Sequence, residues 1–419
     1  LRFVLPPKAV TAVISNWTVS PAIAAELCFI YRYDGRNRMI VKKVPGADST
    51  EMVYDVRDRL AFSRDGNMKT HNQWLVTFYD GLNRPSMTAI YNASTSRDGL
   101  QTSLNTATAS TQTISYTFPG TADLVLGIYD GKPLYQATNS ITLTEGFDTG
   151  AGAEMTAEIN SSATGGNTNI TATNPLPNIP PSALTPLTYT FYDKYDFAGK
   201  QNYVSGDITK VQAGTNPYAE ALPSSASNMT TGLVTGIKVR VLGTDQWLTT
   251  THYYNDKGRL IQDIADNIGG GQDITTTLYD FNGKVLSTYG RHRNPRSGTI
   301  PETKVLTTMA YDAAGRLTNI KKKLNDTEPE KTIVVNEYDE LGQLKSKRLG
   351  ATASSQLEKL NYEYNIRGWL KSINKDFVGT NNSTDNWFGE DLSYDYGFTV
   401  QQFNGNIAGA KWKSLSDGK

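Results

Sequence analysis

Few residues of this 419-residue chain have the types and spacing that chemistry requires. The histidines are His71, His252 and His292, and none lies in a His-Glu-x-x-His pattern or in a His/Cys spacing typical of zinc sites. Cys28 is the single cysteine, and its neighbours Ala25, Leu27, Phe29 and Ile30 are mostly apolar, which favours a buried structural thiol over a nucleophile. The sequence therefore predicts no catalytic residue, no metal site and no cofactor, and hence not an enzyme.

Three further features of the sequence bear on binding chemistry. Residues 269–271 are three glycines without the Lys-Ser/Thr that follows in a phosphate loop, so a hairpin tip is the favoured interpretation. The aspartates form no Asp-x-Asp-x-Asp-Gly calcium loop. Residues 291–296 carry three arginines and a histidine, which is compatible with a phosphate contact or with a solvated loop. We favour the loop because the whole chain is electrically neutral.

Composition excludes several classes of protein. Forty-one Lys+Arg balance 41 Asp+Glu, whereas a dedicated nucleic-acid binder needs a basic surface. The mean hydropathy is −0.44, and no stretch approaches the roughly 18 apolar residues of a membrane-spanning helix. Aromatic residues make up 10% of the chain, too many for disorder. The 23 tyrosines and 36 glycines instead indicate a β-rich protein with many tight turns.

A repeat of the form Tyr-Asp-x-x-Gly-Arg-Leu explains this excess. Successive tyrosines in its regular stretches lie 21 to 32 residues apart. Nine loose copies begin at Tyr33, Tyr54, Tyr79, Tyr192, Tyr254, Tyr279, Tyr311, Tyr338 and Tyr364. The residues that define the motif most clearly are Tyr33, Asp34, Tyr54, Asp55, Tyr79, Asp80, Tyr254, Gly258, Arg259, Tyr279, Asp280, Gly283, Tyr311, Asp312, Gly315, Arg316, Tyr338, Asp339, Gly342, Tyr364 and Gly368.

Each copy predicts a β-hairpin. The residues before each tyrosine alternate in polarity and include β-branched and aromatic side chains, as in residues 360–364. Asp ends the strand by binding nearby backbone amides. Gly, or Asn at Asn37 and Asn83, supplies a residue with positive φ. The return strand then places Leu inward and Arg outward. Stacked hairpins would form one sheet with a ladder of tyrosine rings, stabilised by about 0.2–1 kcal/mol per cross-strand pair.

The repeat resembles the YD repeat of the Rhs family, and the copies at Tyr254 and Tyr311 match it best. The match covers about residues 30–90 and 188–419. Residues 392–397 and 403–413 further resemble the tail of Bacteroidetes-type Rhs proteins. The resemblance implies an all-β fold in which a YD-repeat β-hairpin strip spirals into a hollow shell. Relatives in this sense are the cocoon subunits of insecticidal toxin complexes and the shells of teneurins, and many bacterial members enclose a C-terminal toxin.

Two features of that family are missing from the sequence. The Asp-Pro self-cleavage motif at the end of the family's core is not found, and no separate toxin-like domain follows residue 413. We therefore expect an N-terminal part or a fragment of an Rhs shell without its toxin domain.

Residues 95–190 interrupt the repeat with only two basic residues against seven acidic ones. Alternating segments at 113–118, 124–129, 140–147 and 152–159 predict strands, and the last two resemble a β-coil motif of bacterial surface proteins. We expect a small β-domain or β-solenoid patch, or alternatively a module that binds a glycan or a surface partner. The predicted organisation is a first YD-repeat segment (1–94), an inserted β-rich domain (95–160), a Ser/Thr/Pro-rich linker (161–187) and a second YD-repeat segment (188–419).

The functional expectation is a structural one. The chain would be a shell segment of a secreted or cell-surface bacterial protein that encapsulates or presents a C-terminal toxin. Its expected partners are its own C-terminal shell and toxin region and components of a secretion system or cell surface, with no nucleic acid and no membrane-spanning segment. The alternative is a cell-surface adhesin that binds a glycan or protein partner through the insert and the aromatic sheet faces.

Overall fold

The computed structural model describes residues 2–14, 17–108, 110–129, 131–173, 179–380 and 386–415. The described chain is mostly β and divides into two compact units. Unit 1 comprises Leu1–Asn202, Asn228–His252 and Ala265–Gly270. Unit 2 comprises Tyr203–Ser227, Tyr253–Ile264 and Gly271–Lys419.

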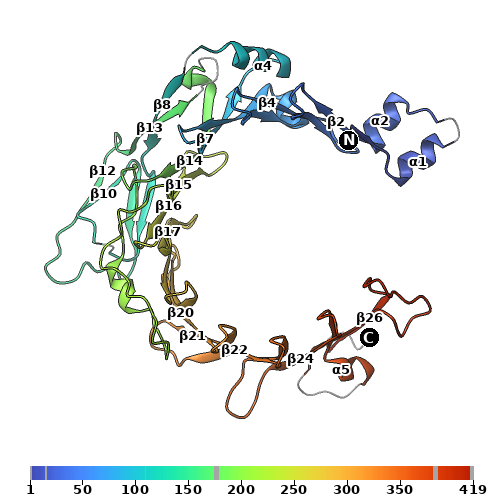
Figure 1. The fold of residues 1–419 in the computed structure, drawn as a ribbon. Helices are drawn as coiled ribbons and strands as arrows, with labels where there is room; N and C mark the ends of the chain where they lie inside the picture. The colour runs from blue at the N-terminus through green and yellow to red at the C-terminus, as the bar shows by residue number, and fades with distance from the viewer. Residues whose placement is uncertain are drawn as a thin grey trace. The chain divides into compact units, whose positions relative to one another are not determined.

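Among the described residues, 21 strands are assigned to a large antiparallel sheet, as the all-β prediction requires (Figure 1). The strands of this sheet that precede the insert are β1 (Phe3–Val4), β2 (Phe29–Tyr33), β3 (Met39–Lys43), β4 (Thr50–Tyr54), β5 (Leu60–Arg64), β6 (Gln73–Tyr79) and β7 (Pro85–Asn92). The remaining strands are β14 (Leu184–Tyr192), β15 (Val234–Arg240), β16 (Trp247–Tyr254), β17 (Leu260–Asp266), β18 (Gln272–Tyr279), β19 (Val285–Arg293), β20 (Glu302–Tyr311), β21 (Leu317–Leu324), β22 (Lys331–Tyr338), β23 (Leu344–Leu349), β24 (Glu358–Tyr364), β25 (Leu370–Ile373), β26 (Phe388–Ser393) and β27 (Gly409–Ser414).

Short helices occupy some of the connections between hairpins. They are α1 (Pro7–Val13), α2 (Pro21–Leu27), α3 (Gly66–Thr70), α4 (Arg97–Thr106), α5 (Lys375–Gly379) and the 3₁₀ turns η1 (Pro181–Ala183) and η2 (Ser205–Thr209). The sequence patterns do not predict these helices. Their N-terminal signals are local: Ser96 accepts a hydrogen bond from the Gly99 amide at the start of α4, and Asp65 accepts one from the Met68 amide at the start of α3.

The hydrophobic core of unit 1 lies on one face of the sheet. The face carries Phe62, Trp74, Val76 and Tyr189, which are essentially inaccessible to solvent. Leu100 and Leu104 of α4 pack on this face beside β4 (Figure 1). The inserted strands contribute further apolar side chains, Ile114, Phe118, Ile170 and Ala172. These inserted strands are therefore part of the core of unit 1 and pack on the sheet.

The insert has two kinds of ladder. Strand β8 (Thr111–Pro119) pairs antiparallel with β13 (Thr164–Thr173). Strands β9 (Asp123–Leu126) and β11 (Ser140–Leu143) pair in parallel, and so do β10 (Leu134–Ala137) and β12 (Thr156–Ile159). Parallel pairing of segments about 20 residues apart is the arrangement of a β-solenoid, as expected for this part of the insert.

The linker expected over 161–187 differs from the structure. Residues Thr164–Thr173 form β13, and β14 already begins at Leu184. The polar composition concealed an alternation in which Thr168, Ile170 and Ala172 point into the core. The part of the predicted linker at 174–178 lies outside the described residues.

Unit 2 buries a row of strand side chains that includes Ile261, Ile274, Leu286 and Tyr289. The irregular segment Tyr203–Ser227 is attached to these strands by polar contacts. The Gln262 side chain accepts a hydrogen bond from the Val204 amide at 2.7 Å and donates one to the Val204 carbonyl at 3.1 Å. The side chain thus pairs with the segment as a neighbouring strand would.

Candidate functional site

In most repeat copies the residue after the tyrosine closes the hairpin, and it is Asp except at Asn255 and Asn365. In the copy at Tyr54, the Asp55 Oδ1 atom accepts hydrogen bonds from the amides of Arg57 and Arg59, both at 2.9 Å. The Asp55 amide donates to the Arg59 carbonyl, which completes the turn. The residue four positions after the tyrosine has positive φ in these copies. The sequence predicted this conformation for Gly and Asn at that position. The residues with positive φ are Asn37, Asp58, Asn83, Gly258, Gly283, Gly315, Gly342 and Gly368.

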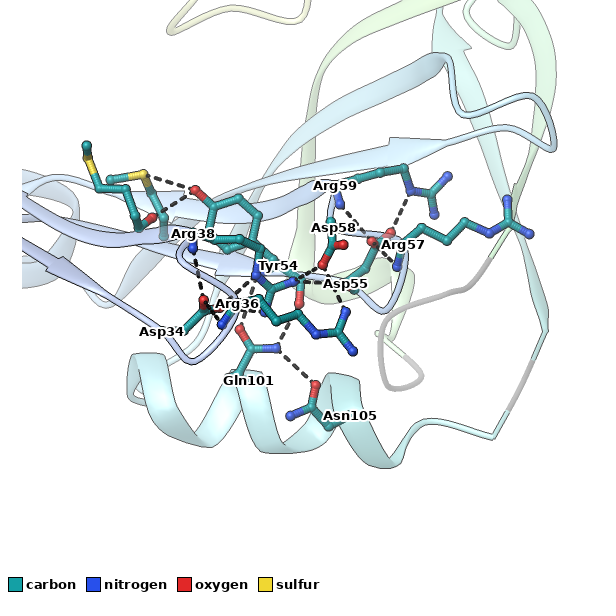
Figure 2. A network of polar contacts seen from close by, with 12 residues as sticks. Asp34, Arg36, Arg38, Tyr54, Asp55, Arg57, Asp58, Arg59, Gln101 and Asn105 are labelled. Carbon is teal, nitrogen blue, oxygen red and sulfur yellow. Dashed lines mark hydrogen bonds and ion pairs between the residues drawn. The ribbon is translucent and has the colours of Figure 1, made fainter.

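The arginine that follows the turn folds back onto the aspartate of its own copy. Arg59 Nε donates to Asp55 Oδ2 at 2.6 Å (Figure 2). The corresponding bonds in other copies are Arg38 to Asp34 at 2.6 Å, Arg84 to Asp80 at 2.7 Å and Arg316 to Asp312 at 2.7 Å. The sequence predicts an outward arginine, and the structure adds that the aspartate side chain holds the guanidinium beside the turn.

The same arginine covers the tyrosine ring of the next copy. The Arg59 guanidinium carbon lies 4.5 Å from the centroid of the Tyr79 ring. Equivalent contacts join Arg38 to Tyr54 at 4.9 Å, Arg84 to Tyr192 at 4.2 Å, Arg316 to Tyr338 at 4.7 Å, Arg259 to Tyr279 at 5.9 Å and Lys284 to Tyr311 at 5.8 Å. In these contacts a cation, rather than the ring of a neighbouring tyrosine, lies on each ring, which corrects the predicted tyrosine ladder.

The tyrosine hydroxyl makes a second bond between copies. It donates to the carbonyl of the first residue of the return strand in the preceding copy. These bonds are Tyr54 to Met39 at 2.8 Å, Tyr79 to Leu60 at 2.9 Å, Tyr192 to Pro85 at 2.9 Å, Tyr279 to Leu260 at 2.9 Å, Tyr311 to Val285 at 2.8 Å, Tyr338 to Leu317 at 2.9 Å and Tyr364 to Leu344 at 3.1 Å. Tyr394 donates to Leu370 at 2.8 Å in the same way, so it belongs to this series although the sequence analysis did not count it.

The positive-φ residue forms a third contact with the preceding copy. Where it is Asp58, its carboxylate accepts bonds from Arg36 at 2.9 Å and Arg38 at 2.6 Å (Figure 2). Where it is Gly315, a Cβ atom would lie 2.5 Å from the Lys284 ammonium group. Gly315 therefore adopts the left-handed conformation without strain, and a side chain there would also have to displace the flexible end of Lys284.

The charges of the motif are suited to holding strands. Burial would raise the pKa of the Asp34 carboxyl, but hydrogen bonds from the Arg38 side chain and from backbone amides outweigh burial and hold that pKa below its usual value. Burial raises the pKa values of the Tyr54, Tyr79 and Tyr311 hydroxyls. At neutral pH the aspartate thus remains an acceptor and the tyrosines remain donors. This protonation pattern matches the hydrogen bonds that Asp34 accepts and that the three tyrosines donate.

Helix α4 adds a contact that the sequence did not reveal. The Gln101 side chain accepts a bond from the Tyr54 amide at 3.2 Å and donates one to the Tyr54 carbonyl at 2.7 Å. It also donates to Asn105 at 3.1 Å (Figure 2). The ladder between β3 and β4 joins only residues 41–42 to residues 50–51. Gln101 therefore pairs with the backbone amide and carbonyl of Tyr54, which lies beyond the end of that ladder.

Unit 2 contains a buried ion-pair cluster at the segment predicted to be a basic loop. Arg291 lies in β19, donates to Asp207 of η2 at 2.9 Å and binds Glu302 of β20 at 2.8 Å. Arg293 binds Glu302 at 2.8 Å. The prediction of a solvated loop is wrong for these two arginines, because Glu302 on the adjacent strand neutralises both of them and Asp207 also binds Arg291.

The motif residues are thus distributed as one set per hairpin and are not gathered at a single centre. Among the described residues, no group of three or more His, Cys, Asp or Glu has the arrangement of a metal site. The described helices include none that is long and apolar enough to span a membrane. The candidate functional feature is therefore the repeated contact between adjacent copies.

The chain matches no protein-family model and no curated protein. It is similar to solved structures of toxin-complex proteins. The crystal structure of TcdB2-TccC3-Cdc42 is 13% identical with a TM-score of 0.31, over 98% of this chain and 17% of that one. A Tc holotoxin pore of Photorhabdus luminescens is 13% identical with a TM-score of 0.28 and the same shares. This chain spans about 17% of the length of these proteins. Because the scores are low, function is inferred from the repeat and its geometry.

Proposed function

We propose that this chain is a wall segment of an Rhs-type shell that encloses or presents a toxin or effector. The observation that carries the proposal is the coupling of adjacent copies, in which the tyrosine hydroxyl and the arginine each join one hairpin to the next. Such coupling extends a sheet by one hairpin at a time in a fixed direction. A sheet built in this way is suited to forming an extended wall.

The composition of the motif supports a mechanical role for that wall. Most of the hydrogen bonds and ion pairs described for the motif lie within one copy or join it to the next, and the sequence offers no catalytic constellation. In this proposal the protein is not an enzyme and acts by exclusion, keeping its cargo away from the surroundings. The proposed location is secreted or at the bacterial cell surface, with the remaining shell, the toxin region and components of secretion as partners.

Electron microscopy of the protein encoded by the complete gene tests this function. The expected result is a hollow particle with additional density inside it. Removal of the toxin-coding region should leave the outer particle intact and empty. A solid rod, or a chain of separate globules, would overturn the shell and favour the alternative of a surface adhesin, for which the exposed strands of the insert provide the supporting observation.

A further inference from the structure

The parallel strands of the insert form two stacked coils. Strands β9 and β10 belong to the first coil, and β11 and β12 belong to the second. Their registers place Leu143 on Leu126, Ala157 on Tyr135 and Ile159 on Ala137. Corresponding positions of the two coils therefore have comparable side-chain directions and differ in what lies next to them.

Solvent exposure differs sharply between the two coils. In the first coil, Leu126 is 7% exposed and Ala137 is fully buried. Their counterparts in the second coil, Leu143 and Ile159, are 52% and 62% exposed. In a solenoid each coil covers the apolar column of its neighbour, and terminal coils usually carry a polar cap. The second coil carries aliphatic side chains at an uncovered end.

The backbone of the second coil also has an open edge. The Thr156 amide donates to the Pro133 carbonyl and the Asn160 amide to the Ala137 carbonyl, both at 2.8 Å. Because consecutive residues of a strand direct their amides to opposite edges, Ala157 and Ile159 direct theirs away from β10. Within the described ranges, no strand is paired with that edge of β12. An edge of this kind is a template for strand addition.

Charge specifies the kind of segment that would fit. The exposed residues around the second coil include four acidic ones. They are Glu145, Asp148, Glu154 and Glu158. Lys132 is the one basic residue between positions 123 and 160 of the sequence. A basic extended segment would neutralise this surface, whereas an acidic one would be repelled.

We propose that the open end of the coil binds a basic, extended segment of a partner protein, which adds as a strand to β12 and covers Leu143 and Ile159. The inference concerns the insert alone and does not depend on the shell function. It assigns to the insert the recognition of a strand-forming peptide with alternating basic and apolar residues.

Peptide binding to the whole chain tests the proposal. The probe is a short fluorescent peptide in which Lys alternates with Val and Thr, and the matched probe has Glu in place of Lys. Fluorescence anisotropy should show binding of the Lys peptide alone, weakening as salt rises. Ala157→Pro, which removes an outward amide, should weaken binding at least about tenfold.

A charge-reversal pair provides a second, independent variant. Glu154→Lys with Glu158→Lys should weaken binding of the Lys peptide at least about tenfold. The matched control is Glu328→Lys with Glu340→Lys, which changes the net charge equally at exposed positions of unit 2 and should bind as the unmodified chain does. Circular dichroism verifies that each variant is folded. If Ala157→Pro unfolds the insert, the charge-reversal variant alone decides the test.

Two results would overturn the proposal. One is equal binding of the Lys and Glu peptides, or unchanged binding by both insert variants. The other is concentration-dependent self-association of the unmodified chain that Ala157→Pro abolishes, because this would assign the edge to a second copy of the chain.

Discussion

The hydroxyl of Tyr311 donates a hydrogen bond to the carbonyl oxygen of Val285, 2.8 Å away in the preceding hairpin. Replacing Tyr311 by Phe removes this bond and keeps the ring beneath Lys284. We expect the free energy of unfolding to fall by about 0.5–1.5 kcal/mol, the usual net value of one hydrogen bond. Urea unfolding followed by circular dichroism measures the change. The control is Tyr218→Phe, at a side chain that is 72% exposed, and an equal loss there would contradict a specific role for the contact between copies.

The left-handed turn residues should resist substitution by β-branched residues. Gly315 has φ of +79°, and a Cβ atom there would approach Lys284 Nζ to 2.5 Å. Gly315→Val should therefore destabilise the protein by at least ~1 kcal/mol, whereas Gly315→Asn should cost less because Asn adopts this conformation at Asn37 and Asn83. Thermal unfolding of both variants makes the comparison.

Gly368 supplies an independent second position for the same prediction. Its φ is +77°, and a Cβ atom there would lie 3.0 Å from Gln343 Nε2. Gly298→Val is the control, because Gly298 has no atom within 4 Å of the added Cβ and no positive φ. Stability that is unchanged by Val at both Gly315 and Gly368 would refute the proposed requirement for glycine at these turns.

The buried pair of Asp55 and Arg59 should contribute far more than an exposed pair. The Asp55 side chain is 3% exposed, so Arg59→Met would leave its carboxylate without a cation, at a cost of about 3–5 kcal/mol. Arg36→Met removes a guanidinium from Asp58 where both side chains are more than half exposed, and should cost no more than about 1 kcal/mol. Urea unfolding monitored by tryptophan fluorescence compares the two. Similar losses would show that burial of the Asp55 pair has no special weight.

Glu302 should make the stability of unit 2 depend on acid pH. Burial raises the pKa of its carboxyl, but hydrogen bonds from Arg293 and Arg291 outweigh burial and lower that pKa from 4.5 to about 2. A lowered pKa means that the unfolded chain takes up the proton first. The contribution of Glu302 is therefore complete above about pH 4.5 and is lost as pH falls towards 2.

Comparison of Glu302→Gln with the unmodified chain isolates this effect. The variant should be less stable near neutral pH and should lose less of its remaining stability on acidification. Burial raises the pKa of Asp207 above its usual value despite Arg291, so Asp207 changes the stability in the opposite direction as pH falls. The pH curve of the variant must therefore be subtracted from that of the unmodified chain to isolate Glu302. Thermal midpoints measured across the acid range provide the test, with Glu328→Gln as the exposed control. Parallel pH curves for the variant and the unmodified chain would rule out the assigned role of Glu302.

The parts of the fold that were predictable are local ones. The aspartate turn and the positive-φ position involve residues within one copy, so Asp55 and Gly315 could be interpreted from a few neighbours. The arginine positions could not be predicted, because the ring that Arg59 covers is that of Tyr79, in the next hairpin. The tyrosine hydroxyl acceptors depend on the same register between hairpins.

The contacts that depend on distant segments were not predictable. Gln101 binds Tyr54 across 47 positions of sequence, and Asp207 binds Arg291 across 84. A single polar side chain gives no sign of such a partner in advance. For β13 a signal was present, because alternate residues of Thr164–Thr173 are small or apolar, but the high Thr and Asn content favoured the interpretation as a linker.

The pairing of β7 with β14 has a consequence for how such chains can diversify. Tyr192 donates to Pro85 and lies beneath Arg84 as in any adjacent copies, although the entire insert lies between these residues in sequence. The contacts that fix the register thus tolerate a chain of very different length between one return strand and the next tyrosine strand. Evolution can therefore place new modules at this junction without rebuilding the sheet, and the same junction is the natural position for grafting a foreign domain.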